Sequence, residues 1–414
     1  MIRQGFLKIR ILAIFFVGIF FFLFIIGRAL QLQLIPNRKL QELAKRQYRT
    51  AITLFPKRGT IYDRNMNELA VSRKVGSLFA NPNKIKAPKY VARRLSALTG
   101  ISDYKIYQKI KSKKSFVWIE RLLSDSVTQR IKEHPIEGIG ILDEYKRFYP
   151  NQELAGQLLG VVGVDSQGIE GLEYSHDDVL FGKKSSIKMI RDALGRPITF
   201  DETLFVEPQE GVSLILSIEQ SLQFMIEKEL ELAVTKFQAR RGMAIVQDVR
   251  TGEILAMANY PFFNPNRFFE GRRLHWKNAA LTDAFEPGST FKVILSALAL
   301  EEGISPSERF FCENGFYRVN REAAIREAEN HKYGWLSFSD ILKFSSNIGA
   351  AKIASQLGKV VFSRKIFEFG FGRKTGIDAP GESPGIVRPY KEWRLIDLTN
   401  IAFGQGISVT AIQL

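Results

Sequence analysis

A serine and a lysine three residues apart form the first pattern in the sequence that could do chemistry. In the segment Phe285-Glu-Pro-Gly-Ser289-Thr-Phe-Lys292 they stand at the start of an apolar stretch, which predicts a helix over 290–302. Residues three apart share a helix face, with Cβ atoms about 5 to 6 Å apart. A lysine in apolar surroundings loses solvation, and its neutral amine can accept the serine proton. A capping serine beside a surface lysine is the alternative, and it explains most isolated tetrads of this kind.

A second pattern, Ser345-x-Asn347, lies between predicted helices at 339–344 and 348–357. Residues two apart do not share a helix face, so both side chains enter one cleft only if the segment is a turn. There Ser345 could relay a proton between Lys292 and a leaving group, and Asn347 could hydrogen-bond a peptide amide of a substrate. A polar turn between helices, without chemistry, explains the same residues.

The elements that must position these residues read as a mixture of helices and strands. A strand over 212–217 precedes a helix over 218–240, for which Ser217 could be the cap. Two apolar runs within 242–258 surround a polar Asp-Val-Arg-Thr-Gly-Glu turn, which indicates a hairpin. Farther upstream the patterns predict a strand, turn and strand over 57–72, helices over 90–98 and 124–132, and a strand over 116–120.

The composition describes a globular protein with an uneven charge. The 414 residues carry a net charge of +16 and are 45% hydrophobic. The first 50 residues hold nine basic residues and one acidic residue, half of the excess. The remainder shows no nucleic-acid-binding signature, so we expect no nucleic-acid partner. The four histidines are scattered, so no metal site is predicted, and the single Cys312 reads as a small buried residue.

An uncharged apolar run near the N-terminus, ILAIFFVGIFFFLFIIG at 11–27, predicts a membrane anchor. As a helix it would be about 25 Å long at about 1.5 Å per residue, close to the minimum for crossing a bilayer. A cleaved signal peptide or a buried core helix are the alternatives. Basic residues flank both ends, and long domains translocate largely regardless of charge, so the charges do not decide the orientation.

Taken together, these motifs make the sequence resemble the penicillin-binding proteins, and within them class B, most closely the cell-division type. The resemblance spans nearly the whole chain in the family's order. Its motifs are Arg58-Gly-Thr-Ile-Tyr-Asp-Arg-Asn, Arg147-Phe-Tyr-Pro, Gly168-Ile-Glu-Gly-Leu-Glu173, Thr251-Gly-Glu-Ile-Leu-Ala-Met, Glu286-Pro-Gly-Ser-Thr-Phe-Lys292, Ser345-Ser-Asn-Ile-Gly and Phe403-Gly-Gln-Gly-Ile-Ser-Val-Thr.

This resemblance implies an α+β multidomain protein. We expect a short cytoplasmic tail and a single transmembrane helix over 1–34 and a mixed α/β pedestal, or dimerisation-like domain, over 35–205. A transpeptidase domain of helices packed on an antiparallel sheet would occupy 206–414. The bulk of the chain would then lie outside the cell (inner) membrane, with the N-terminus in the cytoplasm.

The resemblance also implies a reaction and partners. Ser289 would attack the D-Ala-D-Ala carbonyl of a peptidoglycan stem peptide with Lys292 as base, and Ser345 would pass a proton to the leaving D-Ala. Asn347 would bind the substrate, and β-lactams would acylate the same serine. No cofactor is implied. The expected partners are stem peptides, the lipid bilayer, a glycosyltransferase of the SEDS type and other division proteins.

The third family motif, Lys-Thr-Gly on a strand beside the cleft, is where the sequence departs from the pattern. A literal Lys374-Thr-Gly is flanked by glycines and prolines, which do not make a central strand, so we reject it. The chain is therefore expected to be truncated before that motif and, alone, to bind β-lactams weakly or not at all. Two alternative functions stay open, a noncatalytic membrane-anchored scaffold and a β-lactam sensor or β-lactamase-like acylase.

Overall fold

The computed structural model describes residues 2–34, 49–112, 114, 116–191, 197–200, 209–321 and 323–414. Contacts divide the chain into two compact units. The first unit is Met1–Phe55, Val75–Glu144 and Lys184–Pro208, and the second is Pro56–Lys74, Tyr145–Lys183 and Gln209–Leu414. The domain boundaries expected at 34 and 205 stay a prediction.

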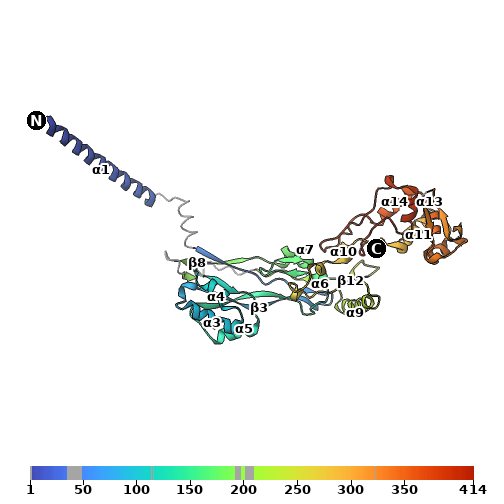
Figure 1. Cartoon of the computed structure of the whole chain (residues 1–414), viewed down its shortest axis with the longest axis horizontal. Helices are drawn as coiled ribbons and strands as arrows, with labels where there is room; N and C mark the ends of the chain where they lie inside the picture. The colour runs from blue at the N-terminus through green and yellow to red at the C-terminus, as the bar shows by residue number, and fades with distance from the viewer. Residues whose placement is uncertain are drawn as a thin grey trace. The chain divides into compact units, whose positions relative to one another are not determined.

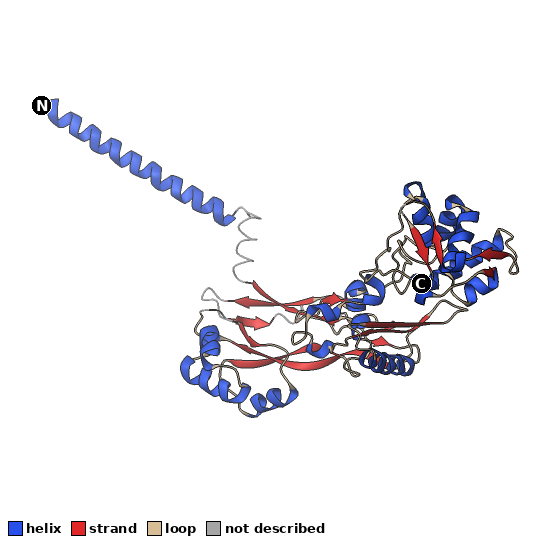
Figure 2. Cartoon of the chain, turned by 45° about the vertical axis from the view of Figure 1, so that its right-hand side comes forward, coloured by secondary structure: helices blue, strands red, loops and turns tan. Residues whose placement is uncertain are grey.

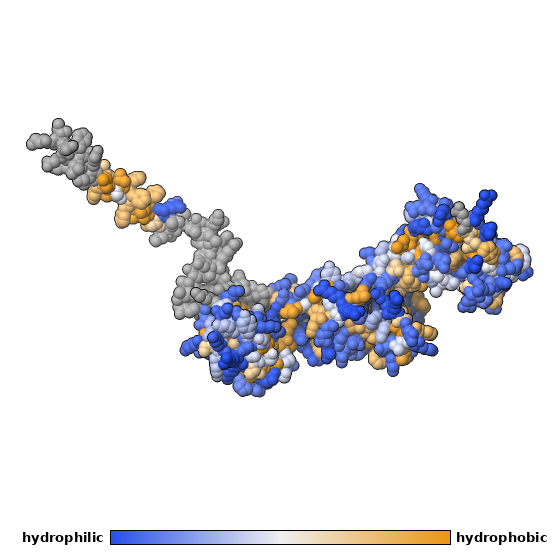
Figure 3. Space-filling view, in the orientation of Figure 1, coloured by the Kyte–Doolittle hydropathy of each residue, from blue (hydrophilic) through white to orange (hydrophobic). Residues whose placement is uncertain are grey.

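The N-terminal helix α1, Ile2–Leu34, opens the first unit (Figure 1). Its segment Leu12–Gln31 is long and apolar enough to cross a membrane. The apolar side chains face outward, with Phe20 73% exposed, and they form the apolar surface of α1 in Figure 3. A core helix would bury such side chains, so that alternative is wrong, and α1 is consistent with the expected single-pass anchor.

Where the structure describes it, the rest of the first unit combines strands of two sheets with three helices. Strand β1, Arg49–Leu54, pairs antiparallel with β8, Ser185–Arg191, which pairs with β9, Pro197–Phe200. The other sheet includes β4, Val117–Glu120, and parts of two strands whose remaining residues belong to the second unit, β3, Glu68–Ala80, and β5, Ile139–Phe148. The helices are α3, Pro88–Thr99, α4, Asp103–Ile110, and α5, Asp125–Glu133. Their buried side chains, among them Leu78, Leu95, Ile106 and Ile119, form one apolar core.

The second unit begins with short elements around a buried ionic cluster. Strand β2, Ile61–Tyr62, pairs with β3 and with β10, Leu214–Ile215. The other elements are α6, Gly156–Leu159, β6, Val161–Val162, β7, Gly168–Glu170, α7, Gly171–Ser175, and α8, Asp177–Leu180.

Arg58, Arg147 and Glu173, which we call the arginine cluster, tie these elements together. Arg58 Nε donates to Glu173 Oε2 at 2.5 Å, and Arg147 Nε donates to Glu173 Oε1 at 2.5 Å. Arg58 Nη1 also donates to Asp177 Oδ1 at 2.5 Å. Arg58 and Glu173 are fully buried. Three motifs of the family resemblance therefore meet in one place, where each charge has its counter-charge.

The predicted hairpin is present and carries a helix. Strands β11, Gly242–Gln247, and β12, Ile254–Tyr260, pair antiparallel, and α9, Gln220–Lys236, packs on them (Figure 1). The predicted cap is wrong, because Ser217 Oγ donates to the Ile254 carbonyl at 2.7 Å. The Asp63 carboxylate accepts from Gln220 N at 3.1 Å, so a distant loop caps α9.

The last part of the second unit is mainly helical (Figure 2). Its helices are α10, Ala279–Thr282, α11, Lys292–Glu301, α12, Phe338–Lys343, α13, Asn347–Leu357, α14, Lys359–Glu368, and α15, Leu395–Ile401. Two antiparallel strand pairs lie among them, β13, Arg309–Phe311, with β16, Trp335–Ser337, and the intervening hairpin of β14, Phe316–Arg318, with β15, Ala324–Arg326. Phe291, Leu295, Ile348 and Phe362 belong to the core that holds α11 and α13 in place. Helices on an antiparallel hairpin match the expected fold class.

Candidate active site

Ser289 and Lys292 stand at the start of α11. Residues Gly288–Phe291 form a 3-10 turn, and the α-helix begins at Lys292, two residues later than predicted. In a 3-10 turn residues three apart are eclipsed, which places Lys292 directly over Ser289. Lys292 Nζ lies 3.1 Å from Ser289 Oγ. Ser289 is exposed, whereas Lys292 is only 2% exposed.

The segment between α12 and α13 supplies the other groups around the lysine. Ser345 lies in the turn with φ of 56°, and Asn347 is the first residue of α13. Lys292 Nζ donates to the Ser345 carbonyl at 2.6 Å, to Ser345 Oγ at 3.0 Å and to Asn347 Oδ1 at 2.8 Å. The structure thus brings all four predicted site residues together. The predicted turn covers Ser345, while Asn347 already belongs to the helix.

The environment of Lys292 increases the fraction of neutral amine. Burial lowers the pKa of Lys292 from 10.5 to about 8, and the negative charge of Glu327 opposes that shift. The acceptors that contact Nζ are the neutral oxygens of Ser289, Ser345 and Asn347. Near neutral pH a useful fraction of the amine can accept a proton from Ser289, which is 3.1 Å away.

Glu327 is the residue that the sequence analysis missed. It is 6% exposed and follows strand β15, and its carboxylate accepts from Ser346 Oγ at 2.5 Å and from Asn347 N at 2.7 Å. A signal was available, since side chains alternate along a strand and Glu327 falls on the face of buried Ile325. A carboxylate on a buried face needs hydrogen-bond or charge partners, so this position could have been predicted to hold nearby polar groups.

The Phe-Gly-Gln-Gly motif at 403–406 supports the serine turn. Gly288 N donates to the Gly404 carbonyl at 3.0 Å, and Gly406 N donates to Glu286 Oε1 at 2.8 Å. Gly404 has φ of 77°, and a Cβ there would come within 2.1 Å of the Gly288 carbonyl oxygen. Only glycine allows the two backbones to approach so closely. The motif therefore fixes the turn that carries Ser289.

The literal Lys374-Thr-Gly lies in a loop, as predicted, and not on a strand. Thr375 N donates to Glu382 Oε1 at 2.5 Å, and Gly376 N donates to Glu382 Oε2 at 3.3 Å. These backbone donors are occupied by a local carboxylate. In the described ranges no strand contains a Lys-Thr-Gly sequence.

Two other kinds of reactive group, the cysteine thiol and clusters of possible metal ligands, add no second site in the described residues. Cys312 is fully buried, as predicted, and its Sγ lies 3.5 Å from Ser346 Oγ. Across the described residues, no group of three or more His, Cys, Asp or Glu side chains could hold a metal ion.

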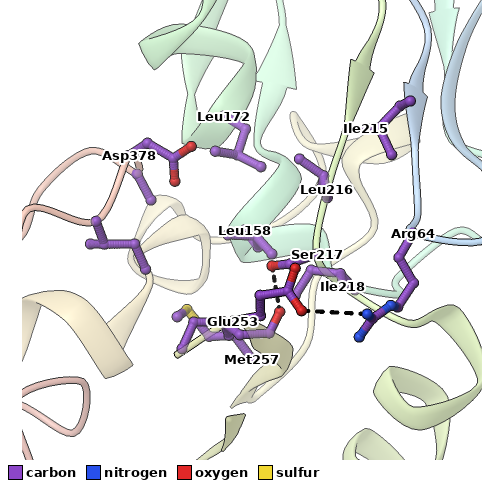
Figure 4. Close-up of a pocket in the computed structure, with 13 residues that line it drawn as sticks. Arg64, Leu158, Leu172, Ile215, Leu216, Ser217, Ile218, Glu253, Met257 and Asp378 are labelled. Atoms are coloured by element: carbon purple, nitrogen blue, oxygen red, sulfur yellow. Dashed lines mark hydrogen bonds and ion pairs between the residues drawn. The ribbon is translucent and has the colours of Figure 1, made fainter. Parts of the chain in front are cut away.

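A cavity of about 580 Å³ occupies a different place in the second unit (Figure 4). Its lining combines apolar side chains, such as Leu158 and Met257, with polar ones. Arg64 Nη2 lies 3.4 Å from Glu253 Oε2 at its wall. None of the four predicted site residues lines this cavity. The cavity is therefore separate from the Ser289 centre.

Comparison with known proteins places the chain in a family. A model described as the penicillin-binding protein transpeptidase domain matches residues 242–414, and one described as the penicillin-binding protein dimerisation domain matches 53–216. The chain is 32% identical over 409 residues to Stage V sporulation protein D of Bacillus subtilis, covering 98% of this chain and 63% of that protein. It is 32% identical over 399 residues to the peptidoglycan D,D-transpeptidase FtsI of Escherichia coli K12, covering 94% and 67%.

A solved structure agrees with these relatives. The complex between penicillin-binding protein 2 and MreC from Helicobacter pylori contains a chain with a TM-score of 0.72 and 25% identity, covering 88% of this chain and 76% of that one. The chain spans about two thirds of the length of the curated relatives, 63% and 67%. From its sequence and its fold, the chain belongs to the class B penicillin-binding proteins.

Proposed function

We propose that the protein is a peptidoglycan D,D-transpeptidase that cross-links stem peptides through an acyl-enzyme on Ser289. The observation that carries the proposal is the 3.1 Å contact between Lys292 Nζ and Ser289 Oγ, in a setting where burial lowers the pKa of Lys292 to about 8. Family membership and the transpeptidase match over 242–414 support it. The name of the relative FtsI, a peptidoglycan D,D-transpeptidase, supports it as well.

The first half of the reaction forms the acyl-enzyme. Ser289 Oγ attacks the carbonyl carbon between the two D-alanines, and its proton moves to the neutral amine of Lys292. The tetrahedral intermediate collapses, the peptide C–N bond breaks, and the departing D-Ala nitrogen takes a proton. Ser345 Oγ, 3.0 Å from Lys292 Nζ, is placed to pass that proton.

The second half resolves the acyl-enzyme. The amine of a neighbouring stem peptide attacks the ester carbonyl and forms the new peptide bond. Its proton returns through Lys292 to Ser289 Oγ as the ester bond breaks. Asn347 orients the lysine through Oδ1 at 2.8 Å, and the same side chain is our proposed contact for a substrate amide.

Labelling with a fluorescent penicillin tests this function. The protein made from its complete reading frame, in native membranes, should gain one penicilloyl group on the peptide that contains Ser289, and Ser289→Ala should remove the label. Slow loss of the adduct fits a transpeptidase, whereas rapid hydrolysis would favour a β-lactamase-like acylase. A wild-type protein that never labels would favour the noncatalytic scaffold.

We further propose that the protein acts in septal wall synthesis. Likeness to FtsI and to Stage V sporulation protein D supports this role, and the resemblance to the division type suggests a SEDS-type glycosyltransferase and other division proteins as partners. Penicillin-binding protein 2 of H. pylori forms a complex with MreC, a precedent for a protein partner. Depletion should give filaments with unfinished septa, whereas swollen cells would indicate elongation.

The proposed orientation puts the N-terminus in the cytoplasm and the body of the chain outside. The substrate class requires this arrangement, because peptidoglycan is cross-linked outside the membrane. Protease added to intact spheroplasts should digest everything beyond α1, whose membrane-spanning segment is Leu12–Gln31. Full protection of the body would reverse the orientation.

A further inference from the structure

Glu327 lies beneath the Ser345–Asn347 turn and takes no direct part in the proposed reaction. We infer that Glu327 is a positioning residue of the Ser289 centre, because its buried carboxylate holds this turn in the shape that directs three oxygens at Lys292. This inference rests on the proposed function for its kinetic consequences. Its structural consequences can be measured without any substrate.

The contacts show what the carboxylate holds. Glu327 Oε1 accepts from Ser346 Oγ at 2.5 Å and from Ile348 N at 3.4 Å, and Oε2 accepts from Asn347 N at 2.7 Å. Both oxygens are therefore bonded to the residues directly after Ser345. Hydrogen bonds to a charged acceptor are among the stronger ones in proteins.

The turn needs such support because its backbone is unusual. Ser345 has φ of 56°, in the left-handed region, which residues other than glycine adopt at a cost in conformational energy. In this conformation both its carbonyl and its hydroxyl contact Lys292 Nζ, at 2.6 and 3.0 Å. A relaxed turn would withdraw these acceptors and misplace the lysine relative to Ser289.

The carboxylate also completes the N-terminus of α13. The first N–H groups of a helix lack partners inside the helix, and a negative charge there is favourable. Ser346 Oγ accepts from Gly349 N at 2.9 Å, while Glu327 accepts from the first two helical residues. Serine and glutamate thus cap one helix together, and Ser346 links the two by donating to Glu327.

The charge of Glu327 has a second effect, opposite in sign to the first. It raises the pKa of Lys292, against the larger lowering by burial. Glu327 also acts on the Cys312 thiol, whose surroundings include the Lys352–Glu313 ion pair. Removing the charge while keeping one acceptor oxygen should make Lys292 easier to deprotonate. Removing the hydrogen bonds as well should disorganise the turn.

Two variants separate these effects. Glu327→Gln keeps an acceptor for Asn347 N without the charge, and Glu327→Ala keeps neither. The matched control is Glu329→Gln, the same charge change on an exposed side chain two residues away. Each variant is made in the complete protein, and the acylation rate by fluorescent penicillin is measured from pH 6 to 10, together with the thermal midpoint.

For Glu327→Gln we expect the midpoint of the rate profile to move down by about half a pH unit or more. For Glu327→Ala we expect the plateau rate to fall about tenfold to a hundredfold. The control should match the wild type. A wild-type midpoint and plateau in both Glu327 variants would overturn the inference, as would a Glu327→Ala variant that loses only thermal stability.

Titration of the lysines themselves keeps the test independent of activity. The protein is labelled with [6-¹³C]lysine, and the Lys292 signal is identified by its loss in Lys292→Arg. Its NMR midpoint should fall in Glu327→Gln and stay unchanged in Glu329→Gln. A wild type that is never acylated would refute the proposed function alone, and the lysine titration would then decide the role of Glu327. A Lys292 midpoint that stays unchanged in both Glu327→Gln and Glu327→Ala would overturn that role.

Discussion

The arginine cluster and the Lys292 centre are both buried groups of charged side chains, but their charged groups have different hydrogen-bond partners. In the arginine cluster each carboxylate oxygen of Glu173 contacts a guanidinium directly, at 2.5 Å. At the Lys292 centre the oxygens of Glu327 are bonded to a hydroxyl and to amides, and the lysine contacts neutral oxygens. Glu327 and Lys292 therefore lie near each other without forming a direct ion pair.

Because of this difference we call the arginine cluster the structural cluster and the Lys292 centre the chemical cluster. A cation bonded to a carboxylate holds its proton, and removing one partner leaves a buried charge uncompensated. A lysine that contacts only neutral acceptors loses solvation, and the nearby charge of Glu327 compensates this loss only in part, so the pKa of Lys292 falls to about 8. The predictions below break one cluster or convert it into the other kind.

The largest effect is expected from Lys292→Arg, which replaces the amine of the chemical cluster with a guanidinium, the cation found in the structural cluster. A guanidinium does not lose its proton in proteins, so the base disappears while the charge stays. Acylation by fluorescent penicillin should fall by about 10²- to 10⁴-fold, the usual contribution of a general base. Lys292→Met serves as the uncharged control and should lose as much. Acylation of Lys292→Arg near the wild-type rate would show that Lys292 is not the base.

The next effect is on stability. Glu173→Gln leaves Arg147 buried without its counter-charge and Arg58 with Asp177 alone, and we expect the free energy of unfolding to fall by about 3 to 5 kcal/mol. Urea denaturation measures this loss. Glu170→Gln, the same change on an exposed neighbour, should alter stability by less than about 0.5 kcal/mol. Equal stabilities of the two variants would mean that the arginine cluster does not hold the fold.

A smaller effect should follow from converting the chemical cluster into the structural kind. Asn347→Asp places a carboxylate where Oδ1 now lies, 2.8 Å from Lys292 Nζ. An adjacent opposite charge raises the pKa of a lysine, commonly by 1 to 3 units, so the midpoint of the acylation profile should move up from about pH 8. Acylation at pH 7 should fall about tenfold or more. Asn347→Ala, which adds no charge, should lower the rate without raising the midpoint, and an equal midpoint in both variants would contradict the comparison.

Local patterns in the sequence predicted one cluster better than the other. Ser289 and Lys292 are three residues apart, so spacing alone put that pair within reach. Ser345 and Asn347 are two apart, so their convergence required a turn between the predicted helices. The family resemblance predicted that the two pairs would meet, although they are more than 50 residues apart. The contacts of Lys292 with Ser345 and Asn347 show that they do. The 3-10 turn before α11 was not predicted, because it depends on the contact of Gly288 with the distant Gly404.

The ionic contacts could not be predicted, because their partners lie far apart along the chain. Arg58 and Glu173 are separated by 115 residues, and nothing in a single sequence pairs them. The same reason explains the wrong cap of α9, since Asp63 reaches Gln220 across 157 residues. Short-range rules find caps from neighbours in sequence, whereas folding uses any acceptor that tertiary structure brings to the helix end.

A third buried carboxyl, Glu227 on α9, tests the comparison at its smallest scale. Its Oε1 accepts from Gln223 Nε2 at 2.7 Å and from Ala155 N at 2.8 Å, both neutral donors, and burial raises its pKa from 4.5 to about 7. A raised carboxyl pKa means that the folded state binds the proton more tightly, so stability present at pH 4 should be lost as the pH rises toward 7. We expect a loss of about 3 kcal/mol between pH 4.5 and 8, measured by urea denaturation, and Glu227→Gln should remove this contribution. The exposed Glu231→Gln is the matched control and should keep the wild-type pH dependence. If Glu227→Gln keeps it too, then a buried carboxyl without a cation is not destabilising here, and the contrast between paired and unpaired buried charges loses its physical basis.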